Sequence, residues 1–202
     1  MRTVRRLVEV VRLLAARAPD LAVRLVVVGG GVLAASLVVP RTHAWDERVV
    51  RRARRLATAR SDRLLRALTR FGRGDALAVG TALAACWLAR RDKTKDAASV
   101  VAASLGAGAA NEIVRRLVAR ERPRFVDVVP PKSASFPSGH ALGSAAFATS
   151  LALALGGAAV VPLAVYTAAM GASRVLLGVH YPSDVATGWV GGFAWALASR
   201  VR

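Results

Sequence analysis

The sequence predicts an all-α protein: an integral membrane bundle of six transmembrane helices, with an amphipathic helix before the first span and interfacial helices after it. Three observations predict this class. Hydrophobic residues make up 54% of the 202 residues, and the mean hydropathy is +0.41, which is high for a soluble protein. The formal net charge is nevertheless +18, and the charge is concentrated in connectors between neutral apolar blocks. Apolar blocks with basic flanks are typical of membrane proteins whose cationic side chains meet anionic headgroups.

The first predicted elements are an amphipathic helix over 1–20 and a span over 25–39. In 1–20, apolar residues recur at helical spacing with charged residues between them, which is typical of a helix that lies on a membrane surface. The run 25–39 also resembles a cleaved signal peptide, but it starts late for one, so an uncleaved first span is preferred. The apolar positions of the amphipathic helix are Val4, Leu7, Val8, Val11, Leu14 and Ala15.

Five further apolar segments complete the six predicted spans. Each is shorter than the ~20 residues of a typical span, but flanking arginines that extend to the interface can lengthen it. Buried helices of a soluble bundle are the alternative, but they would show polar faces, which these segments mostly lack. Gly156, Gly157 and Pro162 divide the uncharged run 141–173 into two helices joined by a tight turn. The five segments are 76–89, 97–111, 141–155, 158–170 and 185–199.

The longest connector, 45–74, is rich in arginine and carries apolar residues at helical spacing. One or two amphipathic helices at the membrane interface fit this pattern, and a solvated charged loop is the alternative. The sequence shows no internal repeat and no low-complexity linker. We therefore expect a single membrane-embedded domain over 1–202.

Composition also limits the partners of the chain. Nucleic-acid binding is the rival explanation of the positive charge, but long neutral stretches interrupt that charge and aromatic residues make up only 5%. We therefore expect membrane lipids as partners and no nucleic acid, and the oligomeric state stays open. Cys86 is the only cysteine, which excludes an intrachain disulfide and a cysteine-cluster metal site.

Three polar islands interrupt the apolar C-terminal half, and the first ends a predicted helix. Arg115 and Arg122 are seven residues apart, so both lie on one face if the helix continues that far, which Pro123 limits. Guanidinium groups bind phosphate oxygens through paired hydrogen bonds and stay charged. Three neighbouring arginines are expected only to anchor the chain at the membrane edge: Arg116, Arg120 and Arg124.

The second island is Pro137-Ser138-Gly139-His140, directly before an apolar segment. Ser138 suits a helix N-cap, and Gly139 allows a ligand to approach the backbone closely. The unpaired N–H groups at a helix start bind anions. His140 would then lie beside a bound phosphate and act as a general acid near neutral pH. The alternative is an ordinary capped helix with a surface histidine.

The third island runs from Ser173 and Arg174 to His180 and Asp184. A carboxylate four residues after a histidine can orient it, as in other sets of nucleophile, base and orienting group. Pro182 suits the first turn of a helix, which places His180 just before that helix and Asp184 in its first turn. Arg174 can reach the same phosphate. The alternative is a helix boundary with a satisfied histidine.

The order of the spans brings the three islands to one side of the membrane. The first two lie between the third and fourth predicted spans, and the third lies between the fifth and sixth. Connections that follow odd-numbered spans emerge on the same side. The islands can therefore form one site with the groups needed to hold a phosphate, attack it and protonate its leaving group.

The three islands resemble the motifs of the type 2 phosphatidic acid phosphatase family, which shares its site architecture with vanadium-dependent haloperoxidases. The family pattern is Lys-x6-Arg-Pro, then Pro-Ser-Gly-His, then Ser-Arg-x5-His-x3-Asp. The second and third motifs match in full at 137–140 and 173–184. The first differs in one place, because Arg115 stands where the family has lysine. The charge is kept, but a compact ammonium becomes a planar fork.

The resemblance implies a membrane lipid phosphatase that works through a phosphohistidine and needs no metal or other cofactor. His180 would attack phosphorus, Asp184 would orient it and balance its charge, and His140 would protonate the leaving oxygen and then activate water. Charge stabilisation, the main requirement in phosphoryl transfer, would fall to the arginines. The groups implied to hold the phosphoryl oxygens are Arg115, Arg122, Arg174, Ser138 and the Gly139 amide.

Several substrates and two other functions remain as alternatives. The candidate substrates are a polyprenyl diphosphate, phosphatidic acid, phosphatidylglycerophosphate and a phosphorylated polyprenyl-sugar lipid. A haloperoxidase-like oxidoreductase that binds vanadate in the same pocket is disfavoured by the hydrophobic spans, because those relatives are soluble. A non-catalytic protein that binds anionic lipids is disfavoured by the intact His140, His180 and Asp184.

Charge counts and the resemblance differ on which side of the membrane the site faces. With the N-terminus inside, the inner connectors carry 12 basic residues and the site side carries 18. The positive-inside rule, applied to these counts alone, favours a cytoplasmic site. Some arginines on the site side serve phosphate, however, and the basic N-terminal flank often dominates. The resemblance implies an outer-face site in bacteria, so we expect a multi-pass protein of the cell membrane with an extracytoplasmic site.

Overall fold

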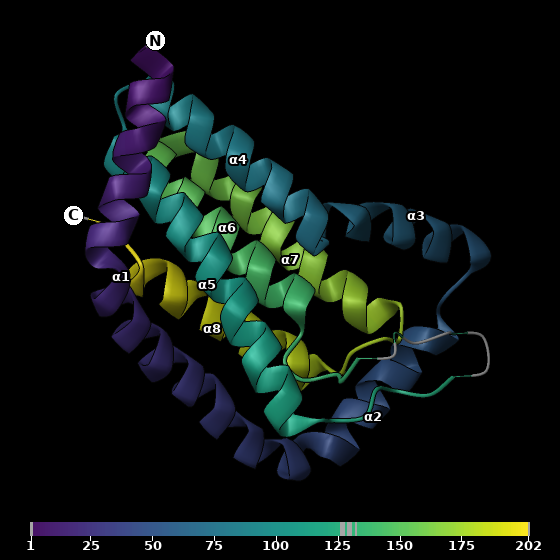
Figure 1. Ribbon diagram of the computed structural model, residues 1–202. Coiled ribbons are helices and arrows are strands. Elements are labelled where there is room, and N and C mark those ends of the chain that lie inside the picture. Colours follow the sequence, from purple (N-terminus) through teal and green to yellow (C-terminus); the bar gives the residue numbers. More distant parts are fainter. Residues whose placement is uncertain (1, 126–127, 129–130, 132, 202) are drawn as a thin grey trace.

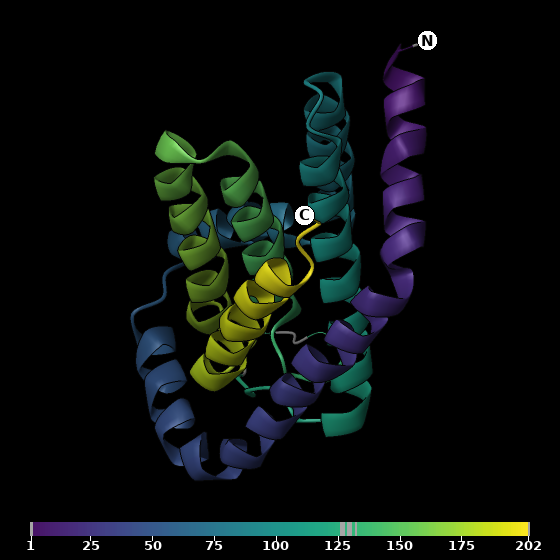
Figure 2. The ribbon, with the colours of Figure 1, turned by 90° about the vertical axis from the view of Figure 1, so that its left-hand side faces the viewer.

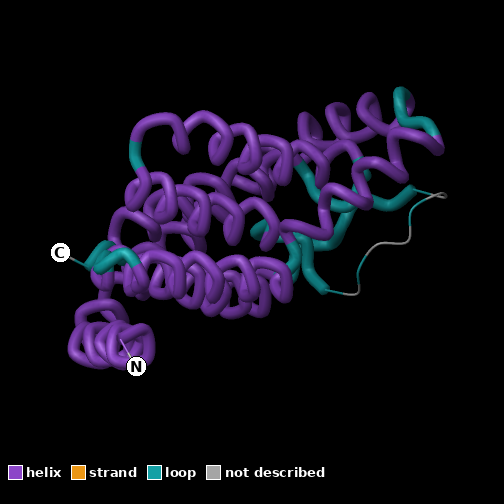
Figure 3. Tube along the Cα trace, turned by 90° about the horizontal axis from the view of Figure 1, so that it is seen from above, coloured by secondary structure: helices purple, strands orange, loops and turns teal. Residues whose placement is uncertain are grey.

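The computed structural model describes residues 2–125, 128, 131 and 133–201. These residues form helices and connecting loops, and no strand occurs among them (Figure 3). The elements in chain order are α1 (Arg2–Ala35), η1 (Ser36–Val38), α2 (Val39–Arg55), α3 (Ala59–Thr69), η2 (Arg70–Gly72), α4 (Gly74–Arg90), α5 (Thr94–Val118), α6 (Gly139–Leu155), η3 (Gly157–Ala159), α7 (Val160–Leu176) and α8 (Pro182–Ala198).

Helix α6 lies at the centre of the bundle, between α5, α7 and α8 (Figure 1). Helix α4 packs beside α5, and α1 runs along the outside against α4, α5 and α8 (Figure 2). Helices α2 and α3 lie at one end of the bundle, where both contact α7 and where α2 also contacts α8. The all-helical prediction is therefore confirmed, and the five later predicted spans correspond to α4, α5, α6, α7 and α8.

The N-terminal helix differs from its prediction. The expected amphipathic helix over 1–20 and the expected span over 25–39 are parts of one continuous helix, α1, which ends at Ala35. The residues between them support a helix, because Arg24 pairs with Asp20 one turn earlier. Pro19 lies inside α1, and the helix changes direction along its length as expected of a proline kink (Figure 2).

Most of the apolar stripe predicted for the first twenty residues is exposed, including Val4, Leu7, Val8 and Val11. The adjacent face of the same helix is not exposed, because Val10, Leu13 and Leu14 lie against a buried cluster that includes Leu88 of α4 and Ala97 of α5. Only Leu14 of the stripe belongs to this packing, and the contact of the stripe with a membrane surface stays a prediction. The helices predicted in 45–74 are confirmed as α2 and α3, although α2 begins earlier, at Val39, and their position at a membrane interface stays a prediction.

Small residues fill the interior of the bundle and large apolar residues cover its outside. The buried positions of α5 are nearly all alanine, serine or valine, and those of α6 are similar. Interiors built of small residues, which let helix backbones approach closely, are typical of membrane helix packing. A bilayer is the solvent in which such an apolar exterior is stable. Large exposed side chains include Val26, Val27, Leu37, Val79, Leu83, Leu105, Ile113, Val161, Val165, Val190 and Leu197.

By length and composition, three helical stretches of the described chain are long and apolar enough to cross a membrane. They are Arg2–Arg55, Thr94–Val118 and Gly157–Leu176, and Gly139–Leu155 is a shorter apolar helix. Only 6% of the apolar window in Arg2–Arg55 is buried inside the protein, so its apolar side chains face outward. These findings support a membrane protein, and the count of six spans stays a prediction.

The loops that carry the three polar islands lie at the end of the bundle away from both termini (Figures 1 and 3). The N-terminal end of α1 meets the α4–α5 turn, where Arg6 donates to the Arg90 carbonyl. The α5–α6 and α7–α8 connections gather at the opposite end with α2. The predicted convergence of the islands on one end is confirmed by this arrangement.

Candidate active site

One cavity of about 680 Å³ collects most of the residues that the sequence singled out. Ser138 and Asp184 are fully buried directly behind its wall. The structure thus brings residues from α5, α6, α7 and both loops to one place. The predicted site residues that line the cavity are Arg115, Arg122, Gly139, His140, Arg174 and His180.

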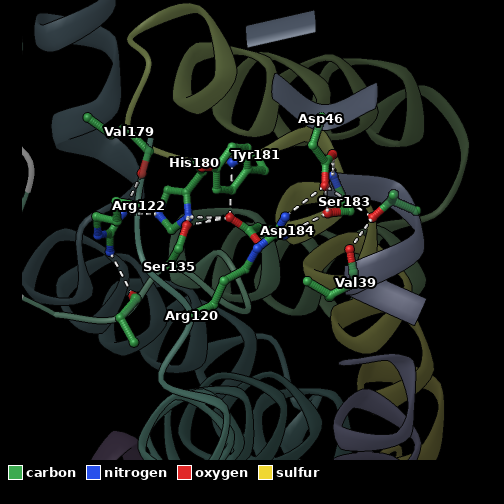
Figure 4. Close-up of polar contacts among 12 residues, drawn as sticks. Val39, Asp46, Arg120, Arg122, Ser135, Val179, His180, Tyr181, Ser183 and Asp184 are labelled. Carbon is green, nitrogen blue, oxygen red and sulfur yellow. Dashed lines mark hydrogen bonds and ion pairs between the residues drawn. The ribbon is translucent and has the colours of Figure 1, made fainter. Parts of the chain in front are cut away.

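His180 lies in the short loop between α7 and α8, directly before Pro182 begins α8, as predicted. Its Nε2 atom is 2.8 Å from Nη1 of Arg122 (Figure 4). A guanidinium can only donate, so Nε2 must be the unprotonated acceptor. The proton then lies on Nδ1, which is 3.5 Å from Oδ2 of Asp184. This tautomer leaves a lone pair on the nitrogen that lies toward the arginines.

Burial controls the charge of both partners in this contact. Desolvation lowers the pKa of His180 to about 4, and the hydrogen bond to Asp184 opposes this only in part. His180 is therefore neutral at neutral pH. Desolvation also lowers the pKa of Arg122 to about 10, which leaves its guanidinium positive at neutral pH. A neutral imidazole beside a fixed cation suits attack on a phosphate anion.

Asp184 lies in the first turn of α8, as predicted, and its carboxylate is fully buried. Its Oδ2 atom accepts hydrogen bonds from the Ser135 hydroxyl at 2.5 Å and from the Tyr181 N–H at 2.9 Å (Figure 4). Its Oδ1 atom accepts one from Arg120 at 2.6 Å. Several donors therefore hold the carboxylate that faces Nδ1 of His180.

Arg122 joins the two loops of the site. Its Nε atom donates to the Ser133 carbonyl at 2.8 Å, and Nη1 donates to the Val179 carbonyl at 2.7 Å. Its Nη2 atom donates to the Ser133 hydroxyl and to the Ala134 carbonyl. The remaining N–H on Nη1 faces Nε2 of His180. Arg122 can thus offer this one donor to a phosphoryl oxygen while its other donors hold the loops.

Arg174 and Ser138 carry buried polar atoms without hydrogen-bond partners. The Nε atom of Arg174, in the last turn of α7, and the hydroxyl of Ser138 have no partner among the described residues. Ser138 occupies the predicted N-cap position of α6, but its side chain makes no capping bond there. Unsatisfied buried donors are rare. Arg174 lines the cavity, and Ser138 directly precedes Gly139, which also lines it.

Arg115 lines the cavity from the C-terminal part of α5, where it forms an ion pair with Glu112. The helix does not continue to Arg122, because α5 ends at Val118 and Ala119 adopts a left-handed conformation with a φ of 46°. The condition for both arginines to share one helical face, a helix that continues to Arg122, is therefore not met. The loop that follows turns back and brings Arg122 to the cavity instead.

His140 lies in the first turn of α6 and is covered by η2. A Cβ atom added to Gly72 would lie 2.9 Å from Cδ2 of His140, which shows how closely the backbone of η2 approaches the ring. Gly139, the residue before His140, packs equally closely against Asn111 of α5. Gly139, which was expected to let a ligand approach the backbone, thus also lets the Asn111 side chain approach it.

The position of Arg120 differs from its prediction. It was expected to anchor the chain at the membrane edge, but its side chain is only 8% exposed and pairs with Asp184 and Asp46. Arg116 and Arg124, by contrast, are largely exposed and pair with neighbouring glutamates, as surface residues do. Sequence position alone did not separate Arg120 from its neighbours, because its two partners come from other helices.

Sequence reasoning also missed four residues that surround the site. A signal was present for two of them, because Asp46 and Glu47 are the only acids in the arginine-rich helix α2 and Asn111 lies one turn before Arg115. Asn111 lines the cavity, and its buried side-chain oxygen has no hydrogen-bond partner within the part of the chain that the structure describes. The four residues are Asp46, Asn111, Ser135 and Ser183.

The arrangement can bind a phosphate and transfer it to a histidine. Three arginines and the N-terminus of α6 provide positive potential, which is the main requirement for stabilising phosphoryl transfer. His180 provides a nucleophile with an orienting carboxylate, and His140 provides a second imidazole in the same cavity. Within the described part of the chain, no group of three or more His, Cys, Asp or Glu side chains is placed to hold a metal ion.

Known proteins are similar to this chain in sequence. The family model described as PAP2 superfamily matches residues 96–201. A decaprenylphosphoryl-5-phosphoribose phosphatase of Mycolicibacterium smegmatis is 41% identical over 128 residues, which cover 61% of this chain and 68% of that protein. The phosphatase of the same name from Mycobacterium tuberculosis is 47% identical over 81 residues, which cover 38% of this chain and 44% of that protein.

Two solved structures share the fold. A transmembrane PAP2-type phosphatidylglycerolphosphate phosphatase from Bacillus subtilis has a TM-score of 0.78 at 21% identity and covers 87% of this chain and 94% of its own. LpxE of Aquifex aeolicus has a TM-score of 0.64 at 23% identity and covers 75% and 92%. The helical arrangement described above is therefore shared with both of these structures.

Proposed function

Because this chain belongs to the PAP2 superfamily, we propose that it is a membrane phosphatase that removes a phosphoryl group from a lipid through a phosphohistidine. One observation carries the proposal: a single cavity joins a phosphate-binding end to an apolar end. Its polar wall carries three arginines and both histidines. Its other wall is formed by small and apolar side chains of α4 and α5, including Leu77, Ala82, Val101 and Leu105. The head and the first part of the tail of a lipid phosphate fit these two surfaces.

The reaction would proceed in two displacements. In the first, Nε2 of His180 attacks phosphorus, the bond from phosphorus to the lipid oxygen breaks, and His140 protonates that oxygen. Asp184 accepts the Nδ1 proton in a hydrogen bond and balances the positive charge that develops on His180. In the second, His140 takes a proton from water, the resulting oxygen attacks phosphorus, and the bond to His180 breaks. The products are an alcohol and inorganic phosphate.

The arginines and the start of α6 would bind the phosphoryl oxygens. Arg174, which lines the cavity, and Ser138, which precedes the lining residue Gly139, each carry a buried donor without a partner among the described residues, which supports this role. Arg122 would exchange its contact with Nε2 of His180 for one with a phosphoryl oxygen when substrate binds. Arg115 and the Gly139 amide complete the proposed set, since both lie on the same wall.

Among the candidate substrates, a phosphorylated polyprenyl-sugar lipid of the polyprenylphosphoryl-5-phosphoribose class is favoured. The names of the mycobacterial relatives support this class. The cavity adds support, because Asn111 places an unpartnered amide oxygen on its wall, where a sugar hydroxyl could donate to it. Phosphatidic acid and phosphatidylglycerophosphate carry fewer hydroxyl groups or none beside the scissile phosphate.

A phosphate-release assay on the detergent-solubilised protein tests this proposal. The panel contains a polyprenylphosphoryl-5-phosphoribose, a polyprenyl diphosphate, phosphatidic acid and phosphatidylglycerophosphate, with His180→Ala as the control. We expect release that needs His180, persists in excess chelator and is fastest with the sugar lipid. A protein that binds these lipids without releasing phosphate would contradict the enzymatic proposal.

We also propose that the whole chain forms one multi-pass domain whose site opens on the extracytoplasmic face. Both termini and the basic start of α1 lie at the end of the bundle away from the site (Figure 1). A basic N-terminal flank favours the cytoplasmic side for that end. The opposing feature is the arginine content of α2 and α3, which lie at the site end.

A further inference from the structure

Helix α2 is joined to the start of α8 by one buried acid. Most of α2 is polar and exposed, yet the side chain of Asp46 is fully buried. Its Oδ1 atom accepts a hydrogen bond from the Ser183 N–H at 3.0 Å, and its Oδ2 atom accepts one from the Ser183 hydroxyl at 2.5 Å (Figure 4). Thr42, one turn earlier in α2, also donates to Oδ2.

The position of Asp46 explains why a charge is stable there. Ser183 is in the first turn of α8, where backbone N–H groups have no acceptor within the helix. A carboxylate at a helix N-terminus supplies such an acceptor and interacts favourably with the helix dipole. Asp46 therefore caps α8 from a different helix. The same α8 turn carries Asp184, the carboxylate that faces His180.

Arg120 connects the two carboxylates directly. Its Nη2 atom is 2.9 Å from Oδ2 of Asp46, and its Nη1 atom is 2.6 Å from Oδ1 of Asp184. The Ser183 hydroxyl accepts a further hydrogen bond from Nη1 at 2.8 Å. The guanidinium also lies over the Tyr181 ring, 4.2 Å from its centroid. Because the guanidinium is planar and rigid, fixing one of its ends fixes the direction of the other.

We propose that Asp46 is a positioning residue, which acts through Arg120 and Ser183 to hold Asp184 in the orientation that His180 needs. The proposal rests on the proposed function, because it concerns the same site. Neither Asp46 nor Arg120 lines the cavity, so neither touches the substrate in this arrangement. Asp184 meets His180 at 3.5 Å, a long contact, so its geometry depends on the groups that hold its other oxygen.

The alternative is that Asp46 only stabilises the fold. A structural role would lower the melting temperature and the yield of folded enzyme but would leave kcat per folded molecule unchanged. A positioning role would lower kcat, and the rate of phosphoenzyme formation, while KM stays nearly constant. These two patterns separate the alternatives, because Asp46 lies behind the catalytic carboxylate and away from the bound lipid.

The test uses the full chain in detergent with four single variants and one double variant. Asp46→Asn keeps the shape but removes the charge, and Glu47→Gln makes the same change at the next residue of α2, which is more exposed and pairs with Arg51. Arg120→Lys keeps the charge but lacks the fork that spans both carboxylates. Ser183→Ala removes the hydroxyl bridge and leaves the backbone cap. Each variant is measured for kcat, KM, phosphoenzyme formation and melting temperature.

We expect Asp46→Asn and Arg120→Lys each to lower kcat by about 10- to 100-fold, as loss of a buried charge-assisted contact does. We expect KM within about twofold of wild type, a smaller fall for Ser183→Ala and no change for Glu47→Gln. The combined Asp46→Asn and Arg120→Lys variant should lose little more than either single one, because residues that act in one chain are not additive.

Three outcomes overturn the proposal. If Asp46→Asn keeps wild-type kcat and only melts earlier, Asp46 is structural. If Asp46→Asn does not fold, the other two variants decide. A wild-type kcat in both Ser183→Ala and Arg120→Lys then shows that the network is structural. If the wild type itself releases no phosphate from any lipid of the panel, the proposed function fails and this inference fails with it. An active wild type with active variants contradicts the inference alone.

Discussion

His180 can act as a nucleophile only as a neutral imidazole with a lone pair on Nε2, and its two neighbours favour that state. Arg122 occupies Nε2 with a donor, and Asp184 lies beside Nδ1. Burial lowers the pKa of the ring to about 4, below its usual value of 6.5. The unfolded chain therefore binds this proton more readily than the folded protein, so the contribution of His180 to stability is lost as the pH falls below about 6.5 toward 4.

The lowered pKa of His180 predicts that the rate of phosphoenzyme formation changes little between neutral and mildly acidic pH. With p-nitrophenyl phosphate at saturation, the rate of phosphoenzyme formation should stay within about twofold between pH 7.5 and 5.5, because the ring remains neutral there. A histidine with the ordinary pKa of about 6.5 would lose about tenfold of its neutral form at pH 5.5. A tenfold fall in rapid-quench measurements would show that the ring titrates normally.

A substitution at Gly72 tests the close contact between η2 and His140. In Gly72→Ala, the new methyl group would meet Cδ2 of His140 at 2.9 Å and Sδ of Met170 at 2.8 Å, so the imidazole must move. We expect phosphoenzyme formation from the lipid to slow by about tenfold or more, since general acids contribute about 10²–10⁴-fold. The rate with p-nitrophenyl phosphate should hardly change, because nitrophenolate leaves without a proton.

Gly74→Ala is the matched control, because nothing lies within 4 Å of a Cβ atom at that position. Equal rates for Gly72→Ala and wild type on the lipid would contradict the role of His140 as general acid. Equal losses on both substrates would instead mean that η2 supports the nucleophile.

Motifs located the groups around the phosphate but not the groups that hold them. The spacing of Arg174, His180 and Asp184 is local, so it could be read along the chain. Arg120 has the same local context as Arg116, and only its burial between two carboxylates distinguishes it. Asp46 meets Ser183 across most of the chain length, and a single sequence carries no record of such a contact.

Helices α6 and α8 approach each other closely because two glycines share one face of α8. Gly188 and Gly192 are four residues apart, and a Cβ atom at either would meet the backbone of α6. At Gly192, it would lie 2.4 Å from the Leu142 carbonyl oxygen. Small residues at this spacing are typical of closely packed membrane helices. The α6–α8 contact matters for function, because both helix starts form the site.

Gly192→Ala should therefore destabilise the protein, by about 1–3 kcal/mol as overpacking does. Gly108→Ala provides the control, since α5 leaves open space there and alanine is the better helix former by roughly 1 kcal/mol. The two variants should shift the thermal melting temperature in detergent in opposite directions. Equal or higher stability of Gly192→Ala would show that the helices do not pack as described.

The later helices were predictable because a charged or glycine-rich connector marks where each apolar block begins and ends. The turn between α6 and α7 follows Gly156 and Gly157, whose φ values of 66° and 50° are rarely adopted by other residues. The first helix was less predictable, because its charged middle resembles a connector. Tertiary contacts support a helix in this charged middle, because Arg24 donates a hydrogen bond to the Ala198 carbonyl and joins the middle of α1 to the end of α8.

At the scale of the molecule, the distribution of side-chain size separates a membrane bundle from a soluble one. Alanine, serine and valine make up most of the interior, whereas the outside carries many large apolar side chains, mainly valine and leucine. Composition predicted the membrane class, and the order of the spans predicted that the site side carries more basic residues, 18 against 12. The site end holds the arginine-rich α2 and α3, and the opposite end holds both termini.

Cysteine labelling in intact cells tests the orientation. In a Cys86→Ala background, Glu121→Cys reports the site end, and Lys95→Cys reports the opposite end; both positions lie outside the helix interior. We expect an impermeant thiol reagent to label position 121 and not position 95, because the basic N-terminal flank stays in the cytoplasm. Labelling of position 95 alone would place the site in the cytoplasm and restrict substrates to lipids of the inner leaflet.

Phosphohistidine trapping measures the proposed chemistry most directly. Detergent-solubilised wild-type protein is mixed with a lipid that carries a labelled terminal phosphate, quenched at alkaline pH within milliseconds and digested for mass spectrometry. We expect a phosphoryl group on His180, because Nε2 of that ring is neutral and faces the arginines. His180→Ala should give folded protein with no labelled peptide and no phosphate release. Label on another residue, or label and release that persist in His180→Ala, would contradict the proposed mechanism.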